Sequence, residues 1–149
     1  AHITEKGFWD VAKLSDQPLI ASHSNAHALT PVARNITDRQ MDAIRERKGI
    51  AGLNYATTML GNDGKEDANM PLSNMVRHID YMVERMGIDC VALGSDFDGA
   101  TIPAEIGDAA GQQNLVIALQ TAGYNDEELT KLCRGNWIRV LKQAWHEAA

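Results

Sequence analysis

Three short, continuous apolar runs constrain the fold of this chain more than any other feature. They lie within "PLIASH" (18–23), "IAGLNYA" (50–56) and "DCVALGSD" (89–96). Apolar residues follow one another in these runs without alternating with polar ones, which is typical of parallel strands buried on both faces. Helical patterns separate the runs, so the sequence predicts an α/β fold of repeated strand–helix units. Such units form either a doubly wound sheet or a (β/α)8 barrel.

Residues that favour helix ends bracket the helical patterns. A side chain able to accept a hydrogen bond from the first turn stands near the start of most of the predicted helices. The expected N-caps are Thr4, Thr37, Ser73, Asn125 and Asn136, with Gln40 and Glu128 completing two capping boxes. Glycines predict the ends of three helices, at Gly49, Gly87 and Gly123. In the first helix, Phe8, Val11 and Ala12 are expected to share the buried face.

Length and charge exclude several classes of protein. The 149 residues suffice for one domain with a buried core, which we place at 1–149. The formal net charge of −6 argues against a nucleic-acid-binding surface, which needs clustered Lys and Arg. No apolar run approaches the roughly 20 residues that span a bilayer, and no signal peptide is visible. The first expectation is therefore a cytoplasmic chain, with the compartment left open.

Polar side chains that can bind metal or carry protons stand where strands end. His23 ends the first apolar run, Asp96 ends the third, and His2 would follow a strand that precedes it. Because the carboxyl ends of parallel strands meet at one edge, we expect these side chains to converge. Neutral imidazoles are good zinc ligands, and a nearby carboxylate can move a proton. The pattern predicts a metal site with His2 and His23 as ligands and Asp96 as proton carrier.

Two histidines do not complete such a site, because catalytic zinc uses three protein ligands. His78 falls in the middle of a predicted helix and His146 near the C-terminus, so both are expected to be exposed or partly packed outside the site. His27, in the loop after His23, is expected to be a bystander. Three neighbouring polar residues could orient the His23 ring from behind, namely Ser22, Ser24 and Asn25.

Arg34 lies in the loop that follows His23, on the side of the predicted site. A guanidinium in that place could hold the carboxylate of a substrate through two parallel hydrogen bonds. The alternative is a salt bridge that only stabilises the loop. Position in the sequence does not decide between these two roles.

Four segments resemble the membrane (renal-type) dipeptidase family, peptidase family M19: "AHIT", "PLIASHSNAHALTPVARN", "VALGSDFDG" and "GNWIRVL". The resemblance implies a (β/α)8 barrel of the metal-dependent hydrolase kind with two zinc ions at its mouth. It further implies hydrolysis of dipeptides, including those with a D-residue at the C-terminal position, by a hydroxide that bridges the two zinc ions. Carried over by motif, His2 and His23 match ligands of one zinc and Asp96 the catalytic acid/base. Arg34 matches the residue that contacts the substrate carboxylate.

The resemblance covers only the C-terminal half of such a barrel. The family's His-x-Asp pair, its zinc-bridging glutamate and a further histidine have no counterpart in this sequence. We therefore expect the N-terminal half on a separate chain or segment, or a second copy of this chain closing the barrel, and activity only in the complete assembly. Two alternatives stay open. One is another metal-dependent amidohydrolase, and the other is an inactive half-barrel that serves as an assembly module.

Overall fold

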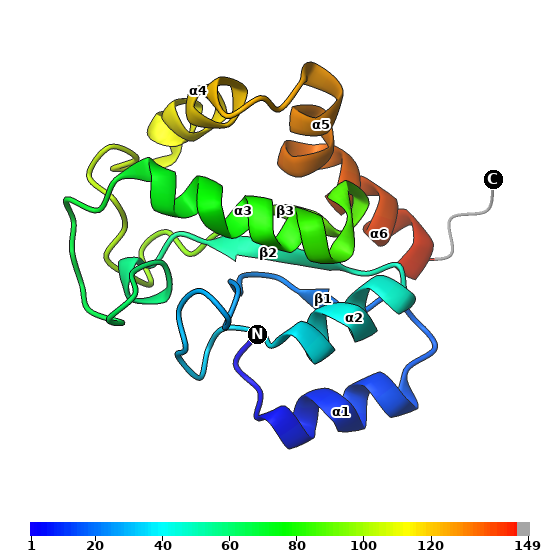
Figure 1. Ribbon diagram of the computed structural model, residues 1–149. Helices are drawn as coiled ribbons and strands as arrows, with labels where there is room; N and C mark the ends of the chain where they lie inside the picture. Colours follow the sequence, from blue (N-terminus) through cyan, green and yellow to red (C-terminus); the bar gives the residue numbers. More distant parts are fainter. Residues whose placement is uncertain (146–149) are drawn as a thin grey trace.

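The computed structural model describes residues 1–145 and shows helices alternating with parallel strands (Figure 1). The strands are β1 (Ile20–Ala21), β2 (Ile50–Asn54) and β3 (Val91–Ser95). The α-helices are α1 (Glu5–Leu14), α2 (Asp38–Glu46), α3 (Leu72–Met86), α4 (Gln112–Thr121), α5 (Asp126–Thr130) and α6 (Asn136–Ala144). Short 3-10 helices cover Thr57–Met59, Ile88–Cys90 and Ala109–Gly111, and a π-helical turn, Lys131–Gly135, joins α5 to α6. Within this described part, no helix combines the length and apolar content needed to cross a membrane.

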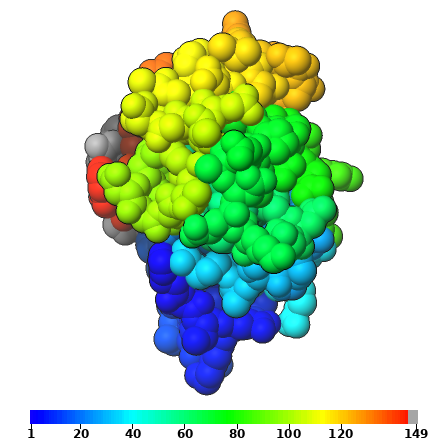
Figure 2. Space-filling model, turned by 90° about the vertical axis from the view of Figure 1, so that its left-hand side faces the viewer, coloured from blue at the N-terminus to red at the C-terminus, as the bar shows by residue number. Residues whose placement is uncertain are grey.

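The three strands form one parallel sheet in the order β1-β2-β3, as the continuous apolar runs predict. Ile20 pairs with Ile50, and Ala51 pairs with Val91. The register between β2 and β3 shifts at the carboxyl end, where Asn54 pairs with Ser95. The arrow of β2 points to the left in Figure 1, and β1 and β3 run parallel to it, so the loops that follow the strands lie on one side of the molecule. Figure 2 looks onto that side, with the N-terminal segment projecting below the body.

The main core lies between the sheet and the helices α2 and α3. Met41 and Ile44 of α2 are fully buried, and Ile79 and Met82 of α3 are also without exposed surface. The helix α1 contributes less than its pattern predicts: Phe8 and Ala12 pack against this core, but Val11 is 49% exposed. No residue of α1 is fully buried, so Val11 does not belong to a buried face.

Three of the predicted N-caps are confirmed by side-chain hydrogen bonds to the first turn of the helix. Thr4 accepts a hydrogen bond from the Gly7 backbone, and Thr37 and Asn125 form complete capping boxes. Ser73 does not cap α3, because the helix begins one residue earlier and Pro71 occupies the N-cap position.

The predicted helix end at Gly49 is wrong by two residues. The C-cap of α2 is Arg47, and Lys48 takes the left-handed conformation with a φ of 52°. Gly49 is needed for a different reason. A Cβ atom there would lie 1.9 Å from the backbone oxygen of Leu19, so only glycine allows the two chain segments to approach.

The segment "GNWIRVL" fastens α6 to the strands through side-chain donors. Asn136 donates through Nδ2 to the backbone oxygens of Ile88 and Val91, and Trp137 donates through Nε1 to that of Leu93. Asn136 is thus a buried clamp within a continuous helical turn, and the prediction that it caps a new helix is wrong. The amide thus supplies donors to one backbone oxygen of the 3-10 helix Ile88–Cys90 and to one of β3.

Candidate metal and substrate site

The imidazole rings of His2 and His23 meet at the side of the molecule where the strands end. Their Nε2 atoms lie 3.0 Å apart, and the ring planes are inclined by 53°. Two nitrogens bound to one tetrahedral zinc ion at ordinary bond lengths are about 3.3 Å apart. The separation of the two nitrogens is therefore close to the one that two ligands of a common zinc ion require. His2 holds its place with a φ of 57°, a conformation that a residue without a positional demand seldom adopts.

Ser22 contacts the far side of the His23 ring. Its Oγ lies 2.7 Å from Nδ1, which leaves Nε2 directed at His2. Burial is the main cause that lowers the pKa of His23, with the charge of Asp96 opposing it. A lowered pKa favours the neutral imidazole that binds metal. Of the three residues expected to orient the ring, Ser22 alone does so among the described residues. Ser24 Oγ is buried and finds no hydrogen-bond partner within residues 1–145, and Asn25 bonds elsewhere.

Asp96 follows β3 in a strained stretch of backbone. Ser95, Asp96 and Asp98 have φ values of 52°, 92° and 64°, all in the region that glycine normally occupies. Strain of this kind persists only where the surroundings hold it, and it is concentrated at functional sites. The Oδ2 atom of Asp96 accepts a hydrogen bond from Nδ2 of Asn54 at 2.9 Å.

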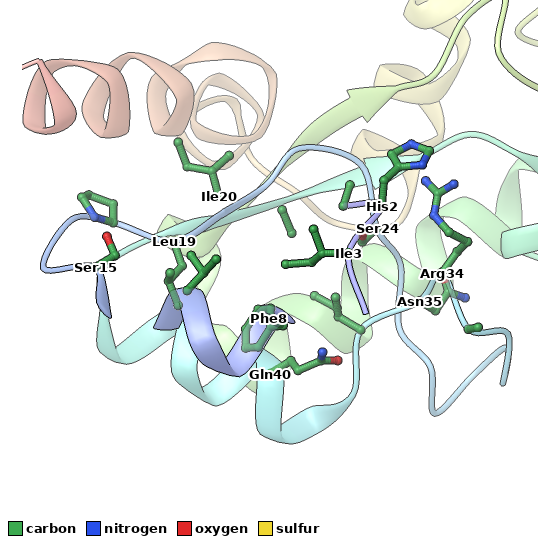
Figure 3. A pocket seen from close by; sticks show the side chains of 16 residues that line it. His2, Ile3, Phe8, Ser15, Leu19, Ile20, Ser24, Arg34, Asn35 and Gln40 are labelled. Carbon is green, nitrogen blue, oxygen red and sulfur yellow. The ribbon is translucent and has the colours of Figure 1, made fainter. Parts of the chain in front are cut away.

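Arg34 reaches the same region with unused hydrogen-bonding capacity. Its Nε and Nη2 atoms are shielded from solvent and have no partner within residues 1–145. The same part of the chain shows no ion pair for Arg34, so the loop salt bridge that sequence alone left open is not formed there. In Figure 3, Arg34 and His2 lie at the same end of a pocket of about 150 Å³. A second cavity of about 210 Å³ is lined by both Arg34 and Asp96.

Three buried asparagines brace the loops that carry these residues. Asn25 binds both backbone groups of Asn54, accepting from its N–H at 2.7 Å and donating to its oxygen at 2.9 Å. Asn35, next to Arg34, accepts from the Asn25 N–H and donates to the Met59 oxygen. Of these three residues, the sequence pattern predicts only Asn25 near the site. The frame has no local signal in the sequence, because Asn25 binds partners that are 10 to 34 residues away.

The residues that the structure describes supply only part of a metal site. Within 1–145, no three His, Cys, Asp or Glu side chains come together as a set of ligands. His27 lines an open pocket with Arg34, and its backbone N–H donates to the Ile36 oxygen. His78 is fully buried, away from His23, so the expectation of an exposed or partly packed side chain is wrong for it. His146 lies outside the described residues.

Comparison with known proteins decides the family. The family model described as membrane dipeptidase (peptidase family M19) matches residues 1–149. The chain belongs to this family. Its α/β architecture is accordingly part of a barrel of the metal-dependent hydrolase kind, as the resemblance implies. The four segments that carry the resemblance are therefore sequence marks of M19 proteins and not a chance pattern.

Solved structures of M19 proteins overlay closely on the chain. The dipeptidase AC, described as an M19 metallopeptidase, matches with a TM-score of 0.95 and 51% identity over 97% of this chain. A metallopeptidase from Rhodobacter sphaeroides, liganded with a phosphinate mimic of the dipeptide L-Ala-D-Ala, gives the same values. The chain covers 43% and 41% of those two proteins.

Curated relatives give the same picture. The protein in the pqqA 5′ region of Klebsiella pneumoniae is 50% identical over 99% of this chain. The dipeptidase tcpJ of Claviceps purpurea is 32% identical over 100% of this chain. The chain spans 54% of the first relative and 35% of the second, so it corresponds to about half of an M19 protein or less.

Proposed function

We propose that this chain supplies one part of the active site of a zinc-dependent dipeptidase. The observation that carries the proposal is the 3.0 Å approach of the His2 and His23 Nε2 atoms beside the Arg34 guanidinium, whose Nε and Nη2 have no partner in the described part of the chain. The first pair suits a cation, and the guanidinium suits a substrate carboxylate. Membership of the M19 family supports this combination.

His2 and His23 would together hold one zinc ion of a binuclear site. Zinc in such a place supplies Lewis acidity, which polarises a carbonyl and lowers the pKa of water. A catalytic zinc ion takes three protein ligands, and the described residues offer two imidazoles. The remaining ligands are proposed to come from outside residues 1–149, from the segment or chain that corresponds to the other part of the relatives.

The chain's own residues would then bind the dipeptide and move a proton. Arg34 holds the terminal carboxylate and so fixes the scissile bond relative to Asp96. When water adds to the carbonyl carbon, Asp96 accepts its proton. When the C–N bond breaks, Asp96 returns that proton to the departing amine, which regenerates the carboxylate.

Dipeptides with a D-residue at the C-terminal position are proposed to be among the substrates. The Rhodobacter sphaeroides protein, 51% identical over the shared part, is liganded with a mimic of L-Ala-D-Ala. Binding through the terminal carboxylate supports this proposal. The guanidinium can bind that carboxylate in both L- and D-residues, because it does not contact the side chain on the same carbon.

The test measures zinc content and dipeptide hydrolysis on the intact native protein and on its Asp96→Asn variant. We expect about two zinc ions per complete site, as in other two-metal hydrolases. The variant is expected to keep its zinc and lose turnover. Full turnover in Asp96→Asn would remove Asp96 from the mechanism. A native protein that binds no zinc and cleaves no dipeptide would overturn the proposal.

A further inference from the structure

Asp96 is held by one specific neighbour, the amide of Asn54. The two side chains come from the adjacent strand ends of β2 and β3, and Nδ2 of Asn54 donates to Oδ2 of Asp96 at 2.9 Å. We infer that Asn54 is a positioning residue for Asp96, an inference that rests on the proposed dipeptidase function. Asn54 binds one carboxylate oxygen and leaves the other to carry the proton.

The orientation of the Asn54 amide is determined by its second contact. The Oδ1 atom accepts a hydrogen bond from the backbone N–H of Ala56 at 2.6 Å. A backbone N–H can only donate, so the atom facing Ala56 must be the amide oxygen. The amide nitrogen therefore faces Asp96 and is always a donor. Oδ2 of Asp96 is correspondingly fixed as an acceptor.

The backbone of Asn54 is fixed as well. Asn25 binds both its N–H and its carbonyl oxygen, and both asparagines are fully buried. Buried polar groups that satisfy one another in this way rigidify their surroundings. The side-chain amide and the backbone of Asn54 are both held by hydrogen bonds. Asn54 therefore presents its Nδ2 donor to Asp96 in a fixed position.

Asp96 needs such a partner because its own backbone does not hold it in a relaxed conformation. Its φ of 92° is a strained backbone conformation, and an unconstrained loop would relax out of it. The donor from Asn54 ties the end of this side chain to the sheet. The other oxygen, Oδ1, lies over Gly99, where an added Cβ atom would come within 2.6 Å of it. Gly99 thus leaves the space that a proton-carrying Oδ1 requires.

The two oxygens of Asp96 consequently have different tasks. Oδ2 stays bound to Asn54 throughout the reaction. Oδ1 takes the proton from the attacking water and gives it to the amine as the C–N bond breaks. A carboxylate that is free to rotate would present either oxygen, and a misplacement of about 1 Å can reduce a rate by about 100-fold.

The test compares Asn54→Ala and Asn54→Leu with the native protein in dipeptide hydrolysis. Both remove the amide donor to Asp96, and Asn54→Leu keeps a side chain of similar size without placing a second carboxyl group beside Asp96. Both are expected to lower kcat by about 100-fold and to change KM by less than about threefold, because Arg34 still binds the carboxylate. The solvent deuterium isotope effect on kcat is expected to rise, since proton transfer becomes rate-limiting.

The control is Asn136→Ala, which removes an equally buried asparagine amide at a distance from Asp96. It is expected to lower stability and leave the isotope effect unchanged. If both Asn54 variants behave like this control while Asp96→Asn is inactive, the positioning role is wrong and the proposed function stands. If Asp96→Asn is fully active, Asp96 does not carry the proton and this inference fails, whereas dipeptide hydrolysis by the native protein stands. If the native protein cleaves no dipeptide, the proposed function fails and this inference fails with it.

Discussion

His78 accepts a hydrogen bond from the backbone N–H of Ala26 through Nδ1, at 3.2 Å. Its Nε2 lies 3.3 Å from Thr30 Oγ1, so this fully buried ring, from the middle of α3, holds the start and the centre of the loop that ends at Arg34. An acceptor at Nδ1 requires the neutral imidazole. Burial is the main cause that lowers the pKa of His78 from 6.5 to about 4.

The first prediction concerns stability at low pH. Between pH 6.5 and 4 the unfolded chain binds a proton at His78 that the folded chain does not, so the free energy of unfolding falls as the pH drops through this window. The loss should reach roughly 3 kcal/mol near pH 4, and none should arise from His78 above pH 6.5. Urea denaturation at a series of pH values measures it. His78→Asn should be less stable at pH 7 and show a shallower pH dependence; an equal slope in both proteins would contradict the prediction.

The second prediction concerns the contact behind the metal ligand. Ser22→Ala removes the Oγ partner of His23 Nδ1, and loss of such a partner typically weakens metal affinity about 10- to 100-fold. Competition with a chelator of known zinc affinity measures the change. Ser24→Ala is the matched control, because Ser24 Oγ has no hydrogen-bond partner within residues 1–145. Equal affinity losses in the two variants would argue against an orienting role for Ser22.

The third prediction concerns the substrate carboxylate. Arg34→Gln removes the charge that would bind it, and a hydrogen bond to a charged group contributes about 1.5–3 kcal/mol, or about 10- to 100-fold in KM. The increase should appear with free dipeptides and be nearly absent with dipeptide amides, whose C-terminus is neutral. Arg39→Gln is the control, since Arg39 is exposed and stacks over Trp9. Equal losses on both kinds of substrate would contradict a carboxylate contact.

The fourth prediction concerns the clamp between α6 and β3. Asn136→Ala removes the donor from the backbone oxygens of Ile88 and Val91, of which the bond to Val91 is buried, and this should cost about 2–4 kcal/mol of unfolding free energy. Asn114 also donates through Nδ2 to a backbone oxygen, that of Glu105, but on the surface. Asn114→Ala should therefore cost less than about 1 kcal/mol, because water replaces the lost bond. Denaturant titration of both variants checks the difference, and similar losses would contradict it.

Local interactions of the fold could be predicted from the sequence. The capping boxes at Thr37 and Asn125 involve residues three positions apart, so the pattern contains both partners. Gly49 and Asn136 were misread because the groups they serve lie far along the chain. Gly49 makes room for the backbone of Leu19, 30 residues before it, and Asn136 binds Val91. The sequence shows which residue types stand at these positions, but the contacts that require them are tertiary contacts with distant segments.

The same distinction holds at the candidate site. In parallel sheets the carboxyl ends of the strands lie at the same edge. This general rule predicts the side of the molecule on which His2 and His23 are found. Their role as ligands, like the roles of Asp96 and Arg34, stays a prediction. The frame of buried asparagines had no signal in the sequence, since asparagine is common in loops and its partners here are mostly backbone groups of other segments.

The contacts of Arg139 have a consequence for the order in which this protein is made. Its guanidinium binds the backbone oxygens of Lys48, Gly49 and Asp89, and it lies 91 positions after the first of these. A ribosome delivers the chain from the N-terminus, so β2 and β3 emerge well before the group that ties their starting ends together. The contacts between Arg139 and the starts of these two strands therefore form only after residue 139 has been synthesised.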